Sequence, residues 1–156
     1  MLFRSSIFTE AIFISRKTVL SGDIRCRRIY DEASPEDGFR VLVDRLWPRG
    51  IKKADAALDL WAKDISPSQD LRIWFAHDPQ KYAQFGELYS DELSVNPAAA
   101  EFTALCASKL EAENVTFLYA AKDTEMNNAT VLRTWVMARI RYKSPGSAAC
   151  ARADKI

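Results

Sequence analysis

The sequence is poor in glycine, histidine and cysteine, and each shortage excludes a class of site. Its 156 residues include five glycines, one histidine and three cysteines. No GxGxxG or Walker pattern is present, which excludes a glycine-rich phosphate loop, and HExxH and GxSxG are absent too. The cysteines form no CxxC pair, which argues against a disulfide framework or a zinc site and fits a reducing, cytoplasmic compartment.

Long apolar runs are also missing. None reaches the length of a membrane-spanning helix, so we expect no membrane contact. The composition, with 48% hydrophobic and 28% charged residues, is typical of a folded globular chain. A chain of this length can bury a sizeable core without a metal or disulfides. We therefore expect one soluble domain, with its cofactor and oligomeric state left open.

Charge is balanced overall but unevenly placed. Lys and Arg total 22 and Asp and Glu total 21, yet residues 1–28 hold six basic and two acidic side chains. Residues 139–156 hold five basic and one acidic side chain, so the middle of the chain is acidic. An acidic body argues against a nucleic-acid surface on the main fold. Nucleic acid is therefore an unfavoured partner.

Three segments are expected along the chain. Residues 1–23 are expected to form an extra leader, either a strand or disordered. A secretory signal is not expected there, because the segment lacks a clean apolar core and a cleavage site. Residues 24–140 form the α/β domain. Residues 141–156 form a flexible basic tail, since a Ser-Pro-Gly-Ser sequence at 144–147 breaks regular structure.

Strand and helix patterns alternate in the central segment. The continuous apolar runs Val41–Val43 and Val115–Ala121 predict adjacent strands buried on both faces, and the arginine-rich stretch Ile24–Tyr30 predicts an edge strand. Helical spacing over residues 54–65 predicts a helix. Further helices are expected after Ser68, Asp78-Pro79 and Asn96-Pro97, where a capping side chain stands at the start, and from about Glu125 past Val136. The expected fold is a single compact α/β domain, with a small, partly parallel sheet covered by several helices.

Both buried strands end in a charged doublet, Asp44-Arg45 and Lys122-Asp123. In open α/β sheets, ligands bind beyond the carboxyl ends of the strands, so the doublets converge if the strands are parallel neighbours. Asn127 and Asn128 stand near the start of the last helix, whose free N–H groups suit an anion. The guanidinium groups of Arg45 and Arg49 match a carboxylate or a phosphate.

The single histidine, His77, is the candidate for proton transfer. Asp44 or Asp123 would orient it or bind a divalent metal. Structural alternatives remain open: Asp44-Arg45 as an internal ion pair, Arg49-Gly50 as turn chemistry, His77 as a hydrogen-bonding group and Asp78 as a helix cap. The tryptophans Trp47, Trp61 and Trp74 are expected in the core.

Four stretches carry a family resemblance: VLVDRLWPRG at 41–50, LDLWAKDISP at 58–67, LRIWFAHDP at 71–79 and TFLYAAKDTEMNNATVL at 116–132. With them, residues 24–136 resemble the YeaO-like proteins, the family of domain of unknown function 488. The resemblance implies a compact α/β protein of bacterial or archaeal cytoplasm and names no activity. It marks these motif positions: Asp44, Arg45, Trp47, Pro48, Arg49, Gly50, Trp74, His77, Asp78, Lys122, Asp123, Asn127 and Asn128.

The hypothesis from the sequence is a protein that binds or acts on a small anionic ligand, a phosphate or a carboxylate, in a polar cleft at the strand ends. The catalytic candidates are His77, Asp44 and Asp123. The ligand-binding candidates are Arg45, Arg49, Lys122, Asn127 and Asn128, and no metal site is expected. The alternative is a ligand-sensing or regulatory module without turnover. A nucleic-acid-associated role is less favoured, because the polar motifs lie in the acidic body.

Overall fold

Four parallel strands form the centre of the protein. The computed structural model describes residues 20–143 and contains β1 (Ile24–Arg28), β2 (Phe39–Leu42), β3 (Leu60–Trp61) and β4 (Val115–Tyr119). The sheet order is β1-β4-β2-β3, and every described pairing is parallel. The expected α/β class and the pairing of the two buried runs are confirmed, with Val41 opposite Phe117. The carboxyl ends of β2 and β4 therefore lie side by side.

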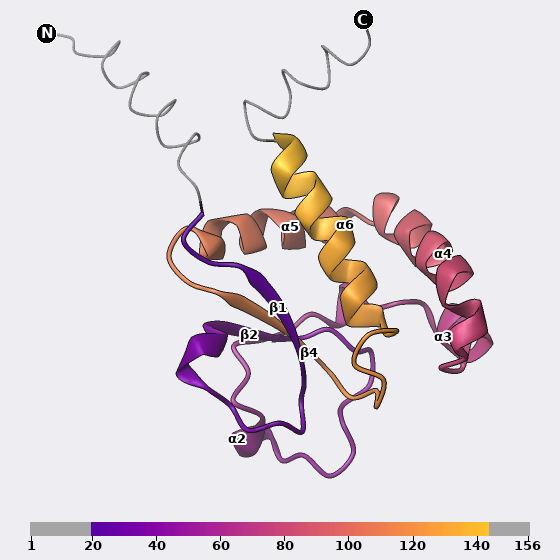
Figure 1. Ribbon diagram of the computed structural model, residues 1–156, viewed down its shortest axis with the longest axis horizontal. Helices are drawn as coiled ribbons and strands as arrows, with labels where there is room; N and C mark the ends of the chain where they lie inside the picture. Colours follow the sequence, from indigo (N-terminus) through magenta and orange to yellow (C-terminus); the bar gives the residue numbers. More distant parts are fainter. Residues whose placement is uncertain (1–19, 144–156) are drawn as a thin grey trace, which may run out of the picture.

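Helices cover the two faces of the sheet unequally. One face packs against α3 (Gln69–Phe75), α4 (Tyr82–Ser94), α5 (Pro97–Leu110) and α6 (Asn128–Lys143), whereas the short α2 (Lys53–Ala56) lies on the other side (Figure 1). Val41 and Phe117 belong to the larger core, and their neighbours Leu42 and Leu118 belong to the smaller one. This alternation follows from the two-residue period of a strand, so the central strands are apolar on both faces.

Local capping signals place the helix starts as expected. The Ser68 hydroxyl accepts a hydrogen bond from the Leu71 amide at 3.2 Å, and Asn96 caps α5 through Ala98 N at 3.0 Å. The Asp78 carboxylate caps the 3-10 turn η3 (Pro79–Lys81), which leads directly into α4. Two further 3-10 turns, η1 (Pro35–Asp37) and η2 (Lys63–Ile65), lie in the connections flanking β2 and β3. These caps satisfy backbone N–H groups that the first helical turn leaves free.

The prediction of a helix over residues 54–65 is wrong. The helical part ends at Ala56, Ala57 is left-handed with φ 52°, and Leu60–Trp61 pair with β2 as strand β3. The backbone amide of Ala62 donates to the Leu42 carbonyl at 2.9 Å. Leu58 and Trp61 still bury apolar surface, but against the smaller core beside β2. Pairing with an open sheet edge thus overrides apolar residues at helical spacing.

Some expected boundaries and burials differ from the structure. Helix α6 continues to Lys143, three residues into the expected tail. Most of the expected leader and tail, residues 1–19 and 144–156, lies outside the described residues. Trp61 and Trp74 pack against the core but are only half-buried, and Trp135 is the buried tryptophan. Within residues 20–143, no helix has the length and apolarity needed to cross a bilayer.

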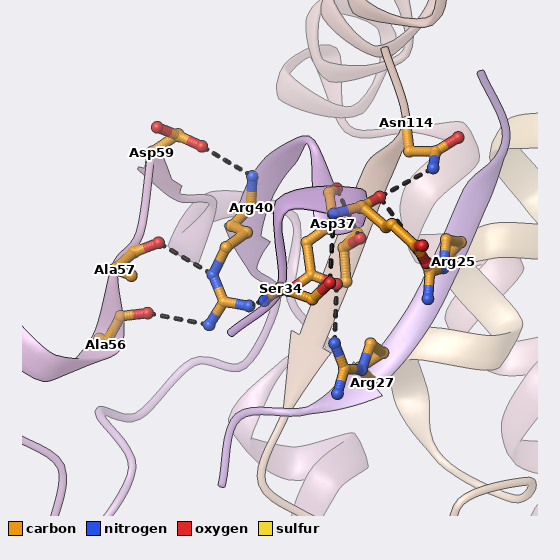
Figure 2. A network of polar contacts seen from close by, with 11 residues as sticks. Arg25, Arg27, Ser34, Asp37, Arg40, Ala56, Ala57, Asp59 and Asn114 are labelled. Atoms are coloured by element: carbon orange, nitrogen blue, oxygen red, sulfur yellow. Dashed lines mark hydrogen bonds and ion pairs between the residues drawn. The ribbon is translucent and has the colours of Figure 1, made fainter. Parts of the chain in front are cut away.

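A buried ionic network holds the connection between β1 and β2 (Figure 2). The Asp37 side chain has no exposed surface; it pairs with Arg27 at 2.8 Å and with Arg40, and accepts Ser34 N at 3.1 Å. Arg40 also donates to the two carbonyl groups at the C-terminal end of α2, at 2.9 and 3.0 Å. Because these buried charges are paired and hydrogen-bonded, the network fastens α2 and η1 to the sheet. Its charged groups therefore serve the fold and are not candidates for a ligand site.

Candidate functional site

A cavity of about 420 Å³ opens where the chain leaves β2 and β4. Its volume lies within the range of small-molecule sites, roughly 300–1,000 Å³. Most of the residues selected from the sequence line it, namely Asp44, Arg45, Arg49, His77, Asn127 and Asn128. They meet because β2 and β4 are parallel neighbours, so the loops after them start at one edge of the sheet.

Asp44 connects the two strand ends. Its Oδ2 accepts a hydrogen bond from the Ala120 amide at 2.9 Å, and its Oδ1 accepts one from Nδ2 of Asn128 at 3.0 Å. Burial raises the pKa of Asp44, while the hydrogen bonds and the nearby charges of His77 and Arg72 oppose that rise. The carboxylate is therefore a fixed part of the cavity wall, held at both oxygens.

The two asparagines also serve the framework. Asn127 is buried and caps α6, with its Oδ1 accepting Thr130 N at 3.0 Å and its Nδ2 donating to the Asp123 carbonyl at 2.8 Å. Asn128 bonds the Val43 carbonyl at 3.2 Å in addition to Asp44. The polar role expected of both residues is thus to place the start of α6 against the end of β2.

Lys122 and Asp123 do not join this group. Both side chains are exposed and neither lines the cavity. The Asp123 carboxylate accepts the amides of Glu125 and Met126, each at 2.9 Å, and these bonds lower its pKa. The carboxylate is thus used by the turn before α6. Within residues 20–143, no three His, Cys, Asp or Glu side chains are grouped to hold a metal ion.

Three arginines line the cavity, and the third was not selected from the sequence. Arg45 donates from Nε to the Pro67 carbonyl at 3.1 Å, whereas Nε of Arg72 is buried without a hydrogen-bond partner. Across residues 20–143, no ion pair involves Arg45, Arg49 or Arg72. Among residues 20–143, Asp44 is the only carboxylate in the lining, so the part of the lining formed by these residues is net positive. The sequence feature that could have identified Arg72 is its position in the same motif as His77. In the structure Arg72 lies on α3, one turn before Phe75.

His77 lies in the cavity lining in an unusual backbone conformation. Its φ is 58° and that of Ala76 is 46°, so two non-glycine residues are left-handed directly after α3. Such a conformation costs about 1–2 kcal/mol per residue, which the surrounding structure must supply. In the described part of the chain no hydrogen bond joins His77 to Asp44, whose oxygens are bound elsewhere. His77 and Asp44 still lie close enough for the charge of His77 to lower the pKa of Asp44.

Aromatic side chains make up much of the remaining wall. Tyr30, Trp47, Phe75 and Phe85 all line the cavity. The Tyr30 hydroxyl donates to the Arg49 carbonyl at 2.8 Å, and Nε1 of Trp47 donates to the Ile51 carbonyl at 2.7 Å. The cavity therefore combines aromatic carbon surface with guanidinium groups that form no ion pair among the described residues.

Comparison with known proteins places the chain in a family. A family model described as the inactive DUF488-N3 subclade matches residues 23–152. The chain belongs to the DUF488 family. It is 47% identical to the uncharacterized protein YeaO of Escherichia coli strain K12 over 114 residues, which are 73% of this chain and 96% of that protein. This similarity confirms the YeaO-like resemblance seen in the sequence motifs.

Mycobacterial relatives of this DUF488 chain are more distant. The uncharacterized proteins Mb3100c of Mycobacterium bovis and Rv3073c of Mycobacterium tuberculosis H37Rv are each 38% identical over 109 residues. The aligned part covers 70% of this chain and 89% of each relative. No solved structure gives a significant match. The names of these relatives state no activity. The chemistry of the cavity itself must therefore indicate what it binds.

Proposed function

We propose that this DUF488 protein binds a small anion, a phosphate or a carboxylate, in the cavity at the ends of β2 and β4 without chemically changing it. The observation that carries the proposal is Nε of Arg72, a buried donor with no hydrogen-bond partner among residues 20–143. Leaving such a donor unsatisfied costs about 1–3 kcal/mol, more for a charged group. Because Arg72 lines the cavity, an anion bound there would place an acceptor beside its guanidinium group.

The charge balance of the lining supports the same ligand. Arg45, Arg49 and Arg72 face a single carboxylate, Asp44, whose two oxygens are already bonded to Ala120 and Asn128. The guanidinium groups keep donors for a ligand, and charge-assisted bonds to a carboxylate or phosphate are stronger than neutral ones. The start of α6 adds partial positive charge at the same edge.

Two observations favour binding over turnover. The family model that matches the chain is described as inactive. Within the described residues, His77 has no hydrogen bond to Asp44, whose two oxygens are bonded to Ala120 and Asn128. A site with anchoring groups but no oriented base suits a ligand-sensing or regulatory module.

The test is calorimetric titration of the full chain with inorganic phosphate and with acetate. Arg72→Met should weaken binding of the favoured anion by about tenfold to a hundredfold, because it removes a charge-assisted hydrogen bond. Arg25→Met is the matched control, since Arg25 bonds the Glu36 carbonyl outside the cavity. The control should bind like the wild type.

Three results would contradict the proposal. Absence of binding for both anions, or an equal loss in both variants, would remove the cavity as an anion site. Hydrolysis of p-nitrophenyl phosphate that disappears in His77→Ala would instead make the protein an enzyme.

A further inference from the structure

The aromatic part of the cavity has no role in holding a bare anion. We infer that the ligand is an anion carried on a flat aromatic ring, with the anionic group at the arginines and the ring against Trp47. This inference rests on the proposed function and specifies the ligand class for the same site.

A small inorganic anion would fill only a small part of the cavity. Its volume is about 420 Å³, whereas one water molecule occupies roughly 30 Å³ in the liquid and a phosphate ion only a few times that. An anion at the guanidinium groups therefore leaves most of the space unfilled. Aromatic and aliphatic side chains line much of that space, so the rest of the ligand is expected to be apolar.

The polar atoms of the two outer aromatic residues are already used. Nε1 of Trp47 is bonded to the Ile51 carbonyl at 2.7 Å, and the Tyr30 hydroxyl to the Arg49 carbonyl at 2.8 Å. What these side chains offer a ligand is ring carbon. The Trp47 ring is also braced edge-on by Trp61, with centroids 5.3 Å apart and planes at 70°. A braced ring loses little conformational freedom when a ligand packs on it.

Phe75 and Phe85 form the buried part of the aromatic lining. The rings of Phe75 and Phe85 are stacked, with centroids 4.1 Å apart and an interplanar angle of 13°, and both residues are buried. Planar guanidinium groups, such as those of Arg45 and Arg72, stack on rings as well as bonding anions. A planar ring gains more from such partners than an aliphatic group of similar size, by up to about tenfold in affinity.

The experiment compares phosphonates that share one anionic group. Calorimetric titration of the full chain with phenylphosphonate, cyclohexylphosphonate and methylphosphonate should give the tightest binding for phenylphosphonate, by about tenfold over methylphosphonate. Trp47→Leu should bring the phenyl-to-methyl ratio close to one. Trp74→Leu is the matched control: Trp74 is half-buried, lies outside the lining and has the Lys81 ammonium 5.0 Å from its ring centroid. It should preserve the wild-type ratio.

The outcomes separate this inference from the proposal beneath it. Equal wild-type affinities for phenylphosphonate and methylphosphonate, or for phenylphosphonate and cyclohexylphosphonate, would overturn the aromatic ligand and leave anion binding in place. No binding of any phosphonate, together with none of phosphate or acetate, would overturn the proposed function itself. Because the ratios are measured on the wild-type chain, they decide the inference even if Trp47→Leu does not fold.

Discussion

Arg27 on the edge strand β1 donates from Nη1 to Oδ1 of Asp37 at 2.8 Å. The bond joins β1 to the turn that leads into β2, two strands that are not neighbours in the sheet because β4 lies between them. Thr116 of β4 completes the link, with its hydroxyl donating to the Asp37 carbonyl at 2.7 Å. Asp37 thus ties three strands together at one position.

Removing the charge of Asp37 should destabilise the protein strongly. In Asp37→Asn, Arg40, only 7% exposed, would lose its buried counter-ion, and breaking such a pair costs about 3–5 kcal/mol. Urea unfolding followed by circular dichroism measures the change. Glu36→Gln is the matched control, because the neighbouring Glu36 side chain is 81% exposed, and it should stay within about 0.5 kcal/mol of the wild type. A loss below about 1 kcal/mol in Asp37→Asn would show that the network is not the support described.

Acid should weaken the fold through the same residue. Burial acts to raise the pKa of Asp37, but hydrogen bonds from Arg27, Ser34 and Arg40 prevail and lower it below its usual 3.8. The stabilisation is therefore present above pH 3.8 and is lost as the pH falls from there through the lower folded value. Urea midpoints measured across this interval should fall more steeply for the wild type than for Asp37→Asn. Parallel slopes would assign the acid sensitivity to other carboxyl groups.

Two glycine substitutions should change stability in opposite directions. Gly38 has φ 65°, and an added Cβ would lie 2.1 Å from the Asn114 carbonyl oxygen, so Gly38→Ala should cost about 2 kcal/mol or more. Gly86 lies in α4, where an added Cβ would meet Val131 Cγ2 at an ordinary 3.7 Å. Gly86→Ala should therefore gain about 0.5–1 kcal/mol from helix propensity. Thermal melts of both variants check the signs, and an unchanged melting temperature in Gly38→Ala would contradict the described backbone.

The site could be partly predicted because of a general property of parallel sheets. Asp44 and Arg45 follow β2 directly, and parallel neighbours bring their carboxyl ends to one edge, so position along the chain implied position in the cavity. The same rule failed for Lys122 and Asp123, since the turn before α6 uses the Asp123 carboxylate for its own amides. Arg72 was missed because the burial of its Nε depends on how α3 packs in the folded chain.

The sequence by itself determined the central strands and the helix starts, because both depend on local causes. A strand covered on both faces must be largely apolar, as residues 115–119 are apart from Thr116. A capping side chain acts within its own helical turn, as at Ser68 and Asn96. Tertiary structure decided what depends on distant partners. Leu60–Trp61 became a strand because β2 offered an unpaired edge, and Asp37 became a buried anchor because Arg27 and Arg40 reach it from two strands. Such pairings have large free energies only in the folded chain, where burial removes competing water, and no local pattern records them.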